Sequence, residues 1–341
     1  MSPPREIEIV GGGLAGLSLG LALRRAGVGV TLFEAGQYPR HRVCGEFIAG
    51  LGAGTIAALG LAPFLAGARQ HREVAWVFGN SSAERRQRLP EPALAISRHR
   101  LDAALAAAFV REGGQLHTGA RVTDTPSRAG RVLCTGRRRA NPGWMGLKFH
   151  VRGLTLATDL ELHLGDQCYV GLAPVEDDRV NVCGLFARRP LCAKGANLLL
   201  GYLQAAGLRS LAQRIAAADI DAASFCAVAG VACDPGITSS AGPSLGDAAG
   251  VTPPFTGNGM AMAFQSAESA LPHLLSYAHG EISWAVCSRL MHEVLADRFD
   301  LRLRTASLLH PWLLRPSRQR WLRALAPVRF PPLRPLYALL H

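Results

Sequence analysis

The sequence of 341 residues has little acidic charge and few aromatic side chains. Its 25 Asp and Glu residues face 37 Lys and Arg residues, which gives a net charge of +12, and aromatic residues make up only 6%. Zinc-finger spacings and RNA-binding signatures are missing, so we expect no nucleic-acid partner. The charge suits an acidic carrier protein, an anionic membrane surface or an anionic ligand, or reflects only an arginine-rich composition.

Paired cysteines and targeting segments are also missing. The eight cysteines contain no CxxC pair, so we expect reduced and mostly buried thiols. His41, His99, His150 and His163 show no ligand spacing, and no metal is expected. The segment "MSPPREIEIV" has no basic start followed by an apolar core, so the expected location is cytoplasmic, either free or peripheral to a membrane. The uncharged run 47–68 is rich in glycine and alanine and is expected to form a packed helix and loop.

A glycine-rich turn lies near the N-terminus. The β-branched run "EIEIV" precedes Gly11, Gly13 and Gly16 in G-x-G-x-x-G spacing, and a helical leucine pattern follows. The next apolar strand, "VGVTLFEA", contains Glu34 near its end. This succession predicts a dinucleotide-binding unit in which a helix N-terminus faces a pyrophosphate. The acid at Glu34 favours a ribose without a 2′-phosphate, which leaves NAD or the AMP half of FAD.

A single carboxylate stands out in the segment 242–270. Asp247 is the only charged residue between Asp234 and Glu268, and it lies in a Gly-Asp-Ala-Ala-Gly turn. Because burying an unpaired carboxylate is costly, we expect a polar ligand beside it, such as the ribityl chain of a flavin. The turn "PPFTGNGM" then leads into a helix from Met260, whose N-terminal N–H groups would face negative charge on a reduced flavin.

The remaining patterns predict further elements around this unit. The stretch 97–122 predicts a helix capped by Ser97 and then a strand, and 131–136 predicts another strand. Alternating apolar and polar positions over 144–233 predict antiparallel strands, whose sheet is expected to cover the bound flavin. Some polar residues on these strands either face the pocket or form only the polar face of the sheet: Lys148, His150, Tyr169 and Asn181.

Several motifs together carry a family resemblance. The stretches "GGGLAG", "CGEFI" (44–48), "SRHRLD", "CTG" and "GDAAGVTPPFTGNGM" resemble those of FAD-dependent oxidoreductases of the p-hydroxybenzoate-hydroxylase fold. That group includes aromatic monooxygenases, flavin-dependent halogenases and geranylgeranyl reductases. The resemblance covers about residues 5–50, 95–140 and 240–275. It implies FAD as the cofactor and leaves NAD(P)H or another electron donor open.

The resemblance also implies which residues contact FAD. The AMP half is expected against Gly11, Gly13, Gly16 and Glu34. Arg98 is expected to reach the cofactor. The ribityl chain and the isoalloxazine ring are expected against Gly246, Asp247, Gly257, Asn258 and Gly259.

Departures from the family pattern bear on the subtype. Aromatic hydroxylases usually carry an Asp-Gly pair where this chain has Thr135 and Gly136, which puts direct use of NADPH in doubt. The Trp-x-Trp-x-Ile-Pro motif of halogenases is missing, so that branch is not expected. "RVCGEFI" looks like a segment near the flavin in prenyl reductases, and "YVGLAP" (169–174) matches another of their elements in part.

The sequence leaves two possible roles open for several individual residues and for the C-terminal stretch. Cys44 is either a catalytic thiol beside the flavin, as a proton donor or substrate contact, or a small packing residue. Arg40 and Arg42 are expected either to contact the cofactor, by pairing with its pyrophosphate or by gating the flavin, or to lie on the solvated surface. We favour the surface for Arg40 and cofactor binding for Arg42. The arginine-rich C-terminal stretch is expected to form either a docking face for a membrane or a carrier protein, or a helical tail packed on its own domain. We favour the packed tail, because the prolines of the stretch break any long continuous amphipathic helix.

The sequence therefore predicts an α/β (α+β) fold with a Rossmann-like FAD-binding domain interleaved with an antiparallel-sheet substrate domain. The FAD-binding domain is assigned to 1–70, 95–140 and 236–275, the substrate domain to 71–94 and 141–235, and a helical C-terminal region to 276–341. The expected function is an FAD-dependent monooxygenase that hydroxylates a hydrophobic aromatic, polyketide or lipid-like molecule of secondary metabolism through a C4a-oxygen flavin adduct. The alternatives are a geranylgeranyl reductase-like reductase of isoprenoid C=C bonds, and a protein that binds cofactor or lipid without turnover.

Overall fold

The first sheet is parallel and is built from segments far apart in the chain. The computed structural model describes residues 3–80, 84–123, 128–137, 143–238, 242–324 and 333–340, and its first sheet has the strand order β6-β2-β1-β7. Its strands are β1 (Ile7–Val10), β2 (Val30–Glu34), β6 (Gln115–Thr118) and β7 (Arg131–Leu133). All their pairings are parallel, as the predicted nucleotide-binding unit requires.

Three helices pack together with this sheet in one core. They are α1 (Leu14–Arg25), α4 (Arg98–Arg111) and α7 (Gly259–Ala278), and α1 contacts both of the others. Leu17 and Leu21 of α1 are fully buried, and each such side chain contributes about 1.5–3 kcal/mol to folding. The Ser97 side chain accepts a 3.2 Å hydrogen bond from Arg100 N, which confirms the predicted cap of α4.

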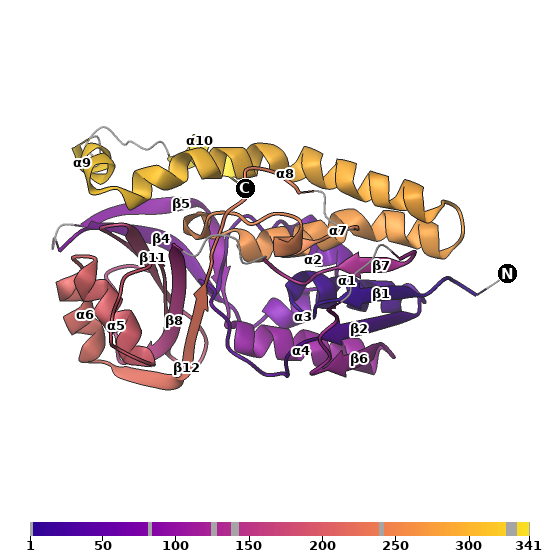
Figure 1. Ribbon diagram of the computed structural model, residues 1–341, viewed down its shortest axis with the longest axis horizontal. Helices are drawn as coiled ribbons and strands as arrows, with labels where there is room; N and C mark the ends of the chain where they lie inside the picture. Colours follow the sequence, from indigo (N-terminus) through magenta and orange to yellow (C-terminus); the bar gives the residue numbers. More distant parts are fainter. Residues whose placement is uncertain are drawn as a thin grey trace.

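A second, larger sheet lies beside the first (Figure 1). Its strand order is β12-β8-β11-β10-β9-β4-β5-β3. The strands are β3 (Phe47–Ile48), β4 (Arg69–Phe78), β5 (Glu84–Ala95), β8 (Trp144–Arg152), β9 (Leu160–Gly165), β10 (Cys168–Pro174), β11 (Arg179–Ala187) and β12 (Asp219–Ala229). The predicted fold class is confirmed, but the sheet is mixed because β4 pairs with β9 in parallel. The long intervening chain makes this crossover feasible.

Two helices interrupt the region where the alternation predicted strands alone. They are α5 (Ala196–Ala205) and α6 (Arg209–Ala216), between β11 and β12. The prediction of strands throughout 144–233 is therefore wrong for these residues. The physical reason is a four-residue spacing of apolar residues, seen in Leu199 and Leu203 on α5 and in Leu211 and Ile215 on α6, which are buried in one core with Phe149.

The C-terminal region is helical, as predicted. Helix α8 (Trp284–Leu314) runs along the length of the molecule and contacts both α7 and the strands β9 and β10 (Figure 1). Its buried side follows residues four apart: Cys287, Met291, Leu295, Phe299 and Leu303. The expectation that prolines break the stretch 300–341 is confirmed at Pro316, because α8 ends at Leu314 and a new helix begins at Pro316, whereas Pro311 is accommodated inside α8. Helices α9 (Pro316–Ala324) and α10 (Leu333–Leu340) follow.

The uncharged run 47–68 contains β3, α2 (Ala53–Ala58) and α3 (Ala62–Leu65), in agreement with the predicted packed helix and loop. Within the described part of the chain, no helix combines the length and the apolar character that a membrane span needs. Two short 3₁₀ turns, η1 (Gly246–Ala248) and η2 (Pro254–Thr256), precede α7.

Candidate functional site

A cavity of about 1210 Å³ extends from the carboxyl ends of the parallel strands to one face of the second sheet. Gly11, Gly13 and Glu34 line one part of it, and Trp76 and Val228 of the second sheet line another. In an open parallel sheet, ligands bind outside the carboxyl ends of the strands. Both sheets therefore contribute to one site.

The glycine turn has three distinct local environments. A Cβ on Gly11, whose φ is +113°, would lie 2.1 Å from Cys134 O, and one on Gly16 would lie 2.1 Å from Gly11 O. On Gly13 the nearest atom would be Arg98 Nη2, at 3.9 Å. Gly11 and Gly16 therefore permit close packing, whereas Gly13 leaves open space at the start of α1. No side chain caps α1, so its first N–H groups are available to an anionic group.

Glu34 lies at the end of β2, and both its oxygens are engaged. They accept hydrogen bonds from Gly12 N and Gly36 N, each at 2.8 Å, and Oε1 pairs with Arg40 at 2.6 Å. Burial by itself raises the pKa of Glu34, but Arg42, Arg40 and the two N–H groups outweigh it and hold the pKa below its usual value. The side chain is therefore an ionised acceptor facing the cavity.

Two arginines are fixed beside the glycine turn by one buried carboxylate. Asp102, fully buried on α4, accepts from Arg98 Nε at 2.7 Å and from Arg42 Nε at 3.0 Å. Both arginines line the cavity. Two guanidinium groups on one carboxylate leave net positive charge at this point, which suits a phosphate or another anion. Arg40, which we expected on the solvated surface, instead pairs with Glu34 and lines the cavity.

Asp247 lies in η1 with its carboxylate in the cavity wall. Burial raises the pKa of Asp247, while Arg137 and Arg98 oppose the rise. Among the described residues, nothing donates a hydrogen bond to this carboxylate. A half-buried acceptor of this kind fits a ligand with hydroxyl groups, such as a ribityl chain.

The second glycine turn lies next to Asp247 in the cavity wall. Gly257 has φ of +70°, and a Cβ there would lie 2.7 Å from Phe47 Cδ1. Gly259 begins α7 and lines the cavity with Gly257. Asn258 is fully buried and does not line the cavity; its Nδ2 donates to Leu340 O and its Oδ1 accepts from Thr256 Oγ1 at 2.7 Å.

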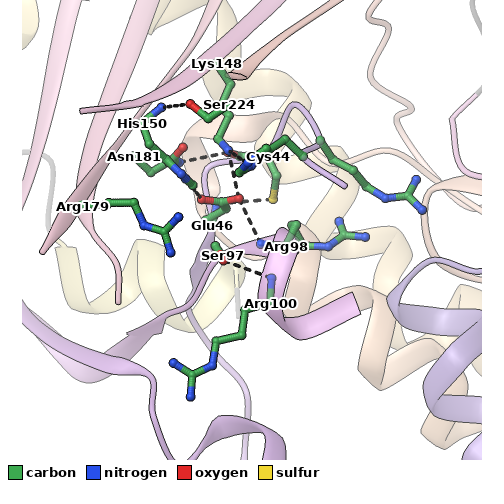
Figure 2. A network of polar contacts seen from close by, with 12 residues as sticks. Cys44, Glu46, Ser97, Arg98, Arg100, Lys148, His150, Arg179, Asn181 and Ser224 are labelled. Carbon is green, nitrogen blue, oxygen red and sulfur yellow. Dashed lines mark hydrogen bonds and ion pairs between the residues drawn. The ribbon is translucent and has the colours of Figure 1, made fainter. Parts of the chain in front are cut away.

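A buried polar cluster, formed by Glu46, Lys148, His150 and Asn181, joins the 40–46 loop to the second sheet (Figure 2). Glu46 Oε2 lies 2.6 Å from His150 Nε2, and Glu46 Oε1 lies 3.3 Å from Lys148 Nζ. Asn181 Nδ2 donates to Cys44 O at 3.0 Å. Burial raises the pKa of Glu46, but His150 and Lys148 outweigh it and hold the pKa below its usual value.

The strand register places this cluster on the inner face. Cys183, Lys148 and Cys226 are paired across β11, β8 and β12, and Asn181, His150 and Asp221 form the next row on the same face. His41 in the loop lies above them, with Nδ1 3.2 Å from Lys148 Nζ. Burial, together with the charge of Lys148, lowers the pKa of His41 to about 4.

Cys44 lines the cavity and lies beside the buried polar cluster. Its Sγ accepts a 3.4 Å hydrogen bond from Glu46 N. Burial raises the pKa of Cys44 above its usual value, although Arg98 opposes this. The thiol therefore keeps its proton at neutral pH, which excludes a ready thiolate nucleophile and is compatible with a proton donor.

The far part of the cavity is mainly apolar, although Arg85 and Gln87 of β5, which are paired with Trp76 and Val74, also line it. Val74, Trp76, Leu162 and Val228 line it from the second sheet, and Leu313 lines it from α8. Tyr169 adds a polar group there: its hydroxyl lies 3.2 Å from His310 Nε2, and burial raises its pKa well above the usual value. A neutral tyrosine in an apolar wall suits a hydrophobic ligand with one polar end.

Most of the residues predicted as site residues thus lie together. Those lining the cavity are Gly11, Gly13, Glu34, Arg42, Cys44, Arg98, Gly246, Asp247, Gly257 and Gly259. Gly16 and Asn258 lie behind the wall. Thr135 and Gly136, which replace the Asp-Gly pair expected from the family pattern, also line the cavity.

Sequence reasoning missed the role of Glu46 and of the residues around it. Glu46 lies inside the "CGEFI" motif, but nothing in its spacing pointed to Lys148 or His150 about a hundred residues later. The available signal was that Lys148, His150 and Asn181 alternate with apolar residues on two strands, a pattern that by itself fits a solvated face equally well.

Comparison with known proteins supports a nucleotide-binding fold. The family described as NAD(P)-binding Rossmann-like domain matches residues 9–65. No curated protein matches the chain in sequence.

Three solved structures show the same fold over most of the chain. A structure of HpxO from Klebsiella pneumoniae, complexed with FAD and uric acid, has a TM-score of 0.75 at 16% identity and covers 98% of this chain and 96% of its own. The flavin-dependent brominase Bmp2 has a TM-score of 0.74 at 18% identity, covering 98% of this chain and 92% of its own. PqsL from P. aeruginosa, in complex with 2-aminobenzoylacetate, has a TM-score of 0.71 at 16% identity, covering 92% and 97% respectively.

Proposed function

We propose that this chain, which has the FAD-binding fold of flavin-dependent monooxygenases and halogenases, is an FAD-dependent monooxygenase acting on a hydrophobic aromatic or lipid-like molecule. The observation that carries the proposal is the single cavity lined by the glycine turn, Glu34 and Asp247 at one end and by apolar strand residues at the other. Its volume of about 1210 Å³ exceeds the roughly 300–1,000 Å³ typical of one small ligand, so it accommodates a cofactor and a substrate together.

The residues present fit FAD. The open space at Gly13 and the uncapped start of α1 suit the pyrophosphate, and Glu34 has acceptor oxygens for a ribose. Asp247 supplies an acceptor for ribityl hydroxyls. When bound, FAD supplies reduction by an electron donor and the activation of oxygen.

The chain's own residues orient the ligands and exclude water. Arg42 and Arg98, fixed by Asp102, supply positive charge beside the cofactor position. The apolar wall of Trp76, Leu162 and neighbouring residues keeps the substrate region dry. Tyr169 keeps its proton and lies in hydrogen-bond contact with His310 Nε2, so its hydroxyl oxygen can still accept a hydrogen bond from a polar group of the substrate.

The first test is FAD binding by the full chain and by two variants. Asp247→Asn should weaken FAD binding by about tenfold or more, because a hydrogen bond to an ionised group is lost. Asp219→Asn, at an exposed position on β12, is the matched control and should bind like the parent. A parent protein that neither retains nor binds FAD contradicts the whole proposal.

The second test separates oxygen transfer from cofactor binding. The FAD-loaded protein is supplied with NAD(P)H or a chemical reductant and with a panel of hydrophobic aromatic compounds, and oxygen uptake and products are measured. A product that has gained one oxygen atom supports the proposal. An FAD-loaded protein that reduces C=C bonds and adds no oxygen to any compound contradicts the monooxygenase assignment.

One observation favours reduction of an isoprenoid C=C bond as a second candidate. Cys44 lines the cavity with its proton retained and can therefore supply the proton to one carbon of a double bond, after which water reprotonates the thiolate. The hydride for the other carbon would be supplied by FAD in its reduced form, when bound. Cys44→Ala should then abolish formation of the saturated product, and Cys183→Ala, another cavity thiol, is the matched control.

The outer face of α8 supports delivery of the substrate from an anionic membrane surface rather than from a carrier protein. Leu301, Leu308 and Trp312 are 64%, 75% and 40% exposed on this face, and Arg304 and Arg315 lie between and beside them. Exposed leucine and tryptophan with arginine suit the membrane interface. Trp312 also lines the cavity, so the exposed face of α8 is continuous with the candidate site.

Vesicle co-sedimentation tests this route. The protein should bind vesicles of phosphatidylcholine with phosphatidylserine more strongly than vesicles of phosphatidylcholine alone. Leu308→Glu should reduce this binding, whereas Val110→Glu, at an exposed apolar position on α4, should not. Equal binding by all three proteins, or no binding by the parent, would refute membrane delivery.

A further inference from the structure

Three side chains with metal-ligating atoms meet between the 40–46 loop and the second sheet. His150 on β8 and Asp221 on β12 are paired in register, and His41 of the loop meets His150 edge-on, with ring centroids 5.2 Å apart. One ligand atom from each of the three lies within 4.8 Å of the other two. No spacing along the chain indicates this group, because its members are far apart in sequence.

His150 has the orientation of a metal ligand. Its Nε2 lies 2.6 Å from Glu46 Oε2, so Nε2 carries the proton and donates it to the carboxylate. This leaves the lone pair on Nδ1, which is buried and has no hydrogen-bond partner among the described residues. A carboxylate that fixes the second nitrogen of an imidazole is the usual support of metal-binding histidines.

We propose that His41, His150 and Asp221 bind a divalent transition-metal cation of the Zn²⁺ class. Two imidazole nitrogens and one carboxylate oxygen form a donor set that zinc accepts. The surrounding charges favour a cation, since the carboxylates of Glu46 and Asp221 outnumber the one ammonium of Lys148.

Lys148 must adjust when the metal binds. Its Nζ lies 3.2 Å from His41 Nδ1 and 3.3 Å from Glu46 Oε1. Ligation through either nitrogen of His41 ends the hydrogen bond to Lys148, because Nδ1 then carries either the metal or the proton. Lys148 keeps its ion pair with Glu46, so its charge stays compensated.

The cation would tie the loop to the sheet. The same loop carries Arg42 and Cys44 into the cavity wall, and β8 and β12 carry the residues opposite. His41 itself lines the cavity, so the metal would fix the loop at the edge of the cavity. This inference does not depend on the proposed function.

Metal binding by the full chain, measured with and without added FAD, tests the proposal. The protein is treated with EDTA, dialysed and titrated with zinc chloride in a calorimeter, and bound zinc is measured by elemental analysis. The expected result is one zinc per chain, with affinity at least about tenfold lower in Asp221→Asn and in His41→Gln. His99→Gln is the matched control, because His99 stacks on His41 at 4.5 Å but belongs to no ligand group found in the described ranges.

Asp221→Asn is expected to fold, because the side chain is only half-buried and asparagine can still accept the 3.2 Å hydrogen bond from Ala223 N. Circular dichroism of the metal-free variants confirms this. Zinc X-ray absorption then identifies the ligands, since Zn–N and Zn–O distances are about 2.0–2.2 Å and Zn–S distances about 2.3 Å.

Two kinds of result would overturn the proposal. A Zn–S signal would place the metal on thiols such as Cys44 and Cys183, which line the cavity nearby. Zinc binding that is unchanged in both ligand variants, or no binding up to about 1 mM zinc, would equally exclude the site.

Discussion

Glu46 Oε2 lies 2.6 Å from His150 Nε2, and both side chains are fully buried. Glu46 has φ of +52°, a conformation that side-chain-bearing residues rarely adopt and that costs about 1–3 kcal/mol. The contacts of its carboxylate with His150, Lys148 and Arg98 N must therefore outweigh this strain. The loop conformation that brings Cys44 to the cavity depends on them.

Glu46→Gln should destabilise the protein by about 3–5 kcal/mol, because it leaves Lys148 as a buried charge with no other carboxylate of the described residues within ion-pair distance. Urea unfolding measures the loss. The double variant Glu46→Gln with Lys148→Met should be more stable than the single one, since the buried charge is gone. Glu281→Gln, at an exposed position, is the control. Equal stability of Glu46→Gln and the control would contradict the importance of the pair.

Gly13→Ala and Gly16→Ala should separate cofactor binding from folding. A Cβ on Gly13 meets nothing closer than 3.9 Å, so the FAD-free variant should be about as stable as the parent, while its FAD affinity falls because the methyl group occupies the space for the phosphates. A Cβ on Gly16 would collide with Gly11 O at 2.1 Å, so that variant should lose stability even without FAD.

Thermal unfolding with and without FAD, together with FAD titration, checks this pair of variants. If Gly13→Ala bound FAD as tightly as the parent, the pyrophosphate would not lie at that residue.

Ser97→Ala should cost more stability than Ser283→Ala, although both serines cap helices. Each accepts a hydrogen bond from the N–H three residues on, worth about 0.5–2 kcal/mol. Ser97 also donates its hydroxyl to the buried Glu176, which would lose that partner. Chemical denaturation of the two variants measures the difference, and equal losses would show that the Glu176 contact contributes nothing.

The stability of the protein should fall in acid in part because of Glu161. Burial raises its pKa, but His163, Ala157 N and Arg214 outweigh this and lower the pKa to about 2, from an ordinary value of 4.5. A lowered folded-state pKa stabilises above about pH 4.5, and this contribution is lost as the pH falls toward 2. Glu161→Gln should therefore lose less stability than the parent between pH 5 and pH 3.

Urea unfolding at several pH values checks the slope. The exposed control Glu281→Gln should follow the parent. A Glu161→Gln variant with the parent's slope would show that Glu161 has no lowered pKa in the folded state.

The nucleotide-binding half could be predicted from the sequence because its signals are local. Gly11, Gly13, Gly16 and Glu34 lie on one strand–turn–helix–strand unit, and the structure places them as their spacing indicates. Asp247 was recognised because it is a lone charge in an apolar run, which local sequence also shows. These features need no knowledge of the rest of the chain.

The buried polar cluster and the helices α5 and α6 could not be predicted in the same way. Lys148 and His150 alternate with apolar residues whether they face water or a carboxylate, and the partner Glu46 lies on a distant loop. The sheet's parallel pairing of β4 with β9 likewise depends on which strands meet, which no local pattern specifies. Asn258 turned out to contact Leu340, a residue beyond any motif.

The position of β1 in the middle of its sheet has a consequence for synthesis on the ribosome. The glycine turn follows β1 directly, but the neighbouring strand β7 ends at Leu133 and α7, which packs against α1, ends at Ala278. Contacts between residues so far apart in sequence form slowly. The nucleotide-binding unit must therefore remain incomplete until the chain as far as Ala278 has been translated, and until then the apolar faces of β1 and α1 lack their partners.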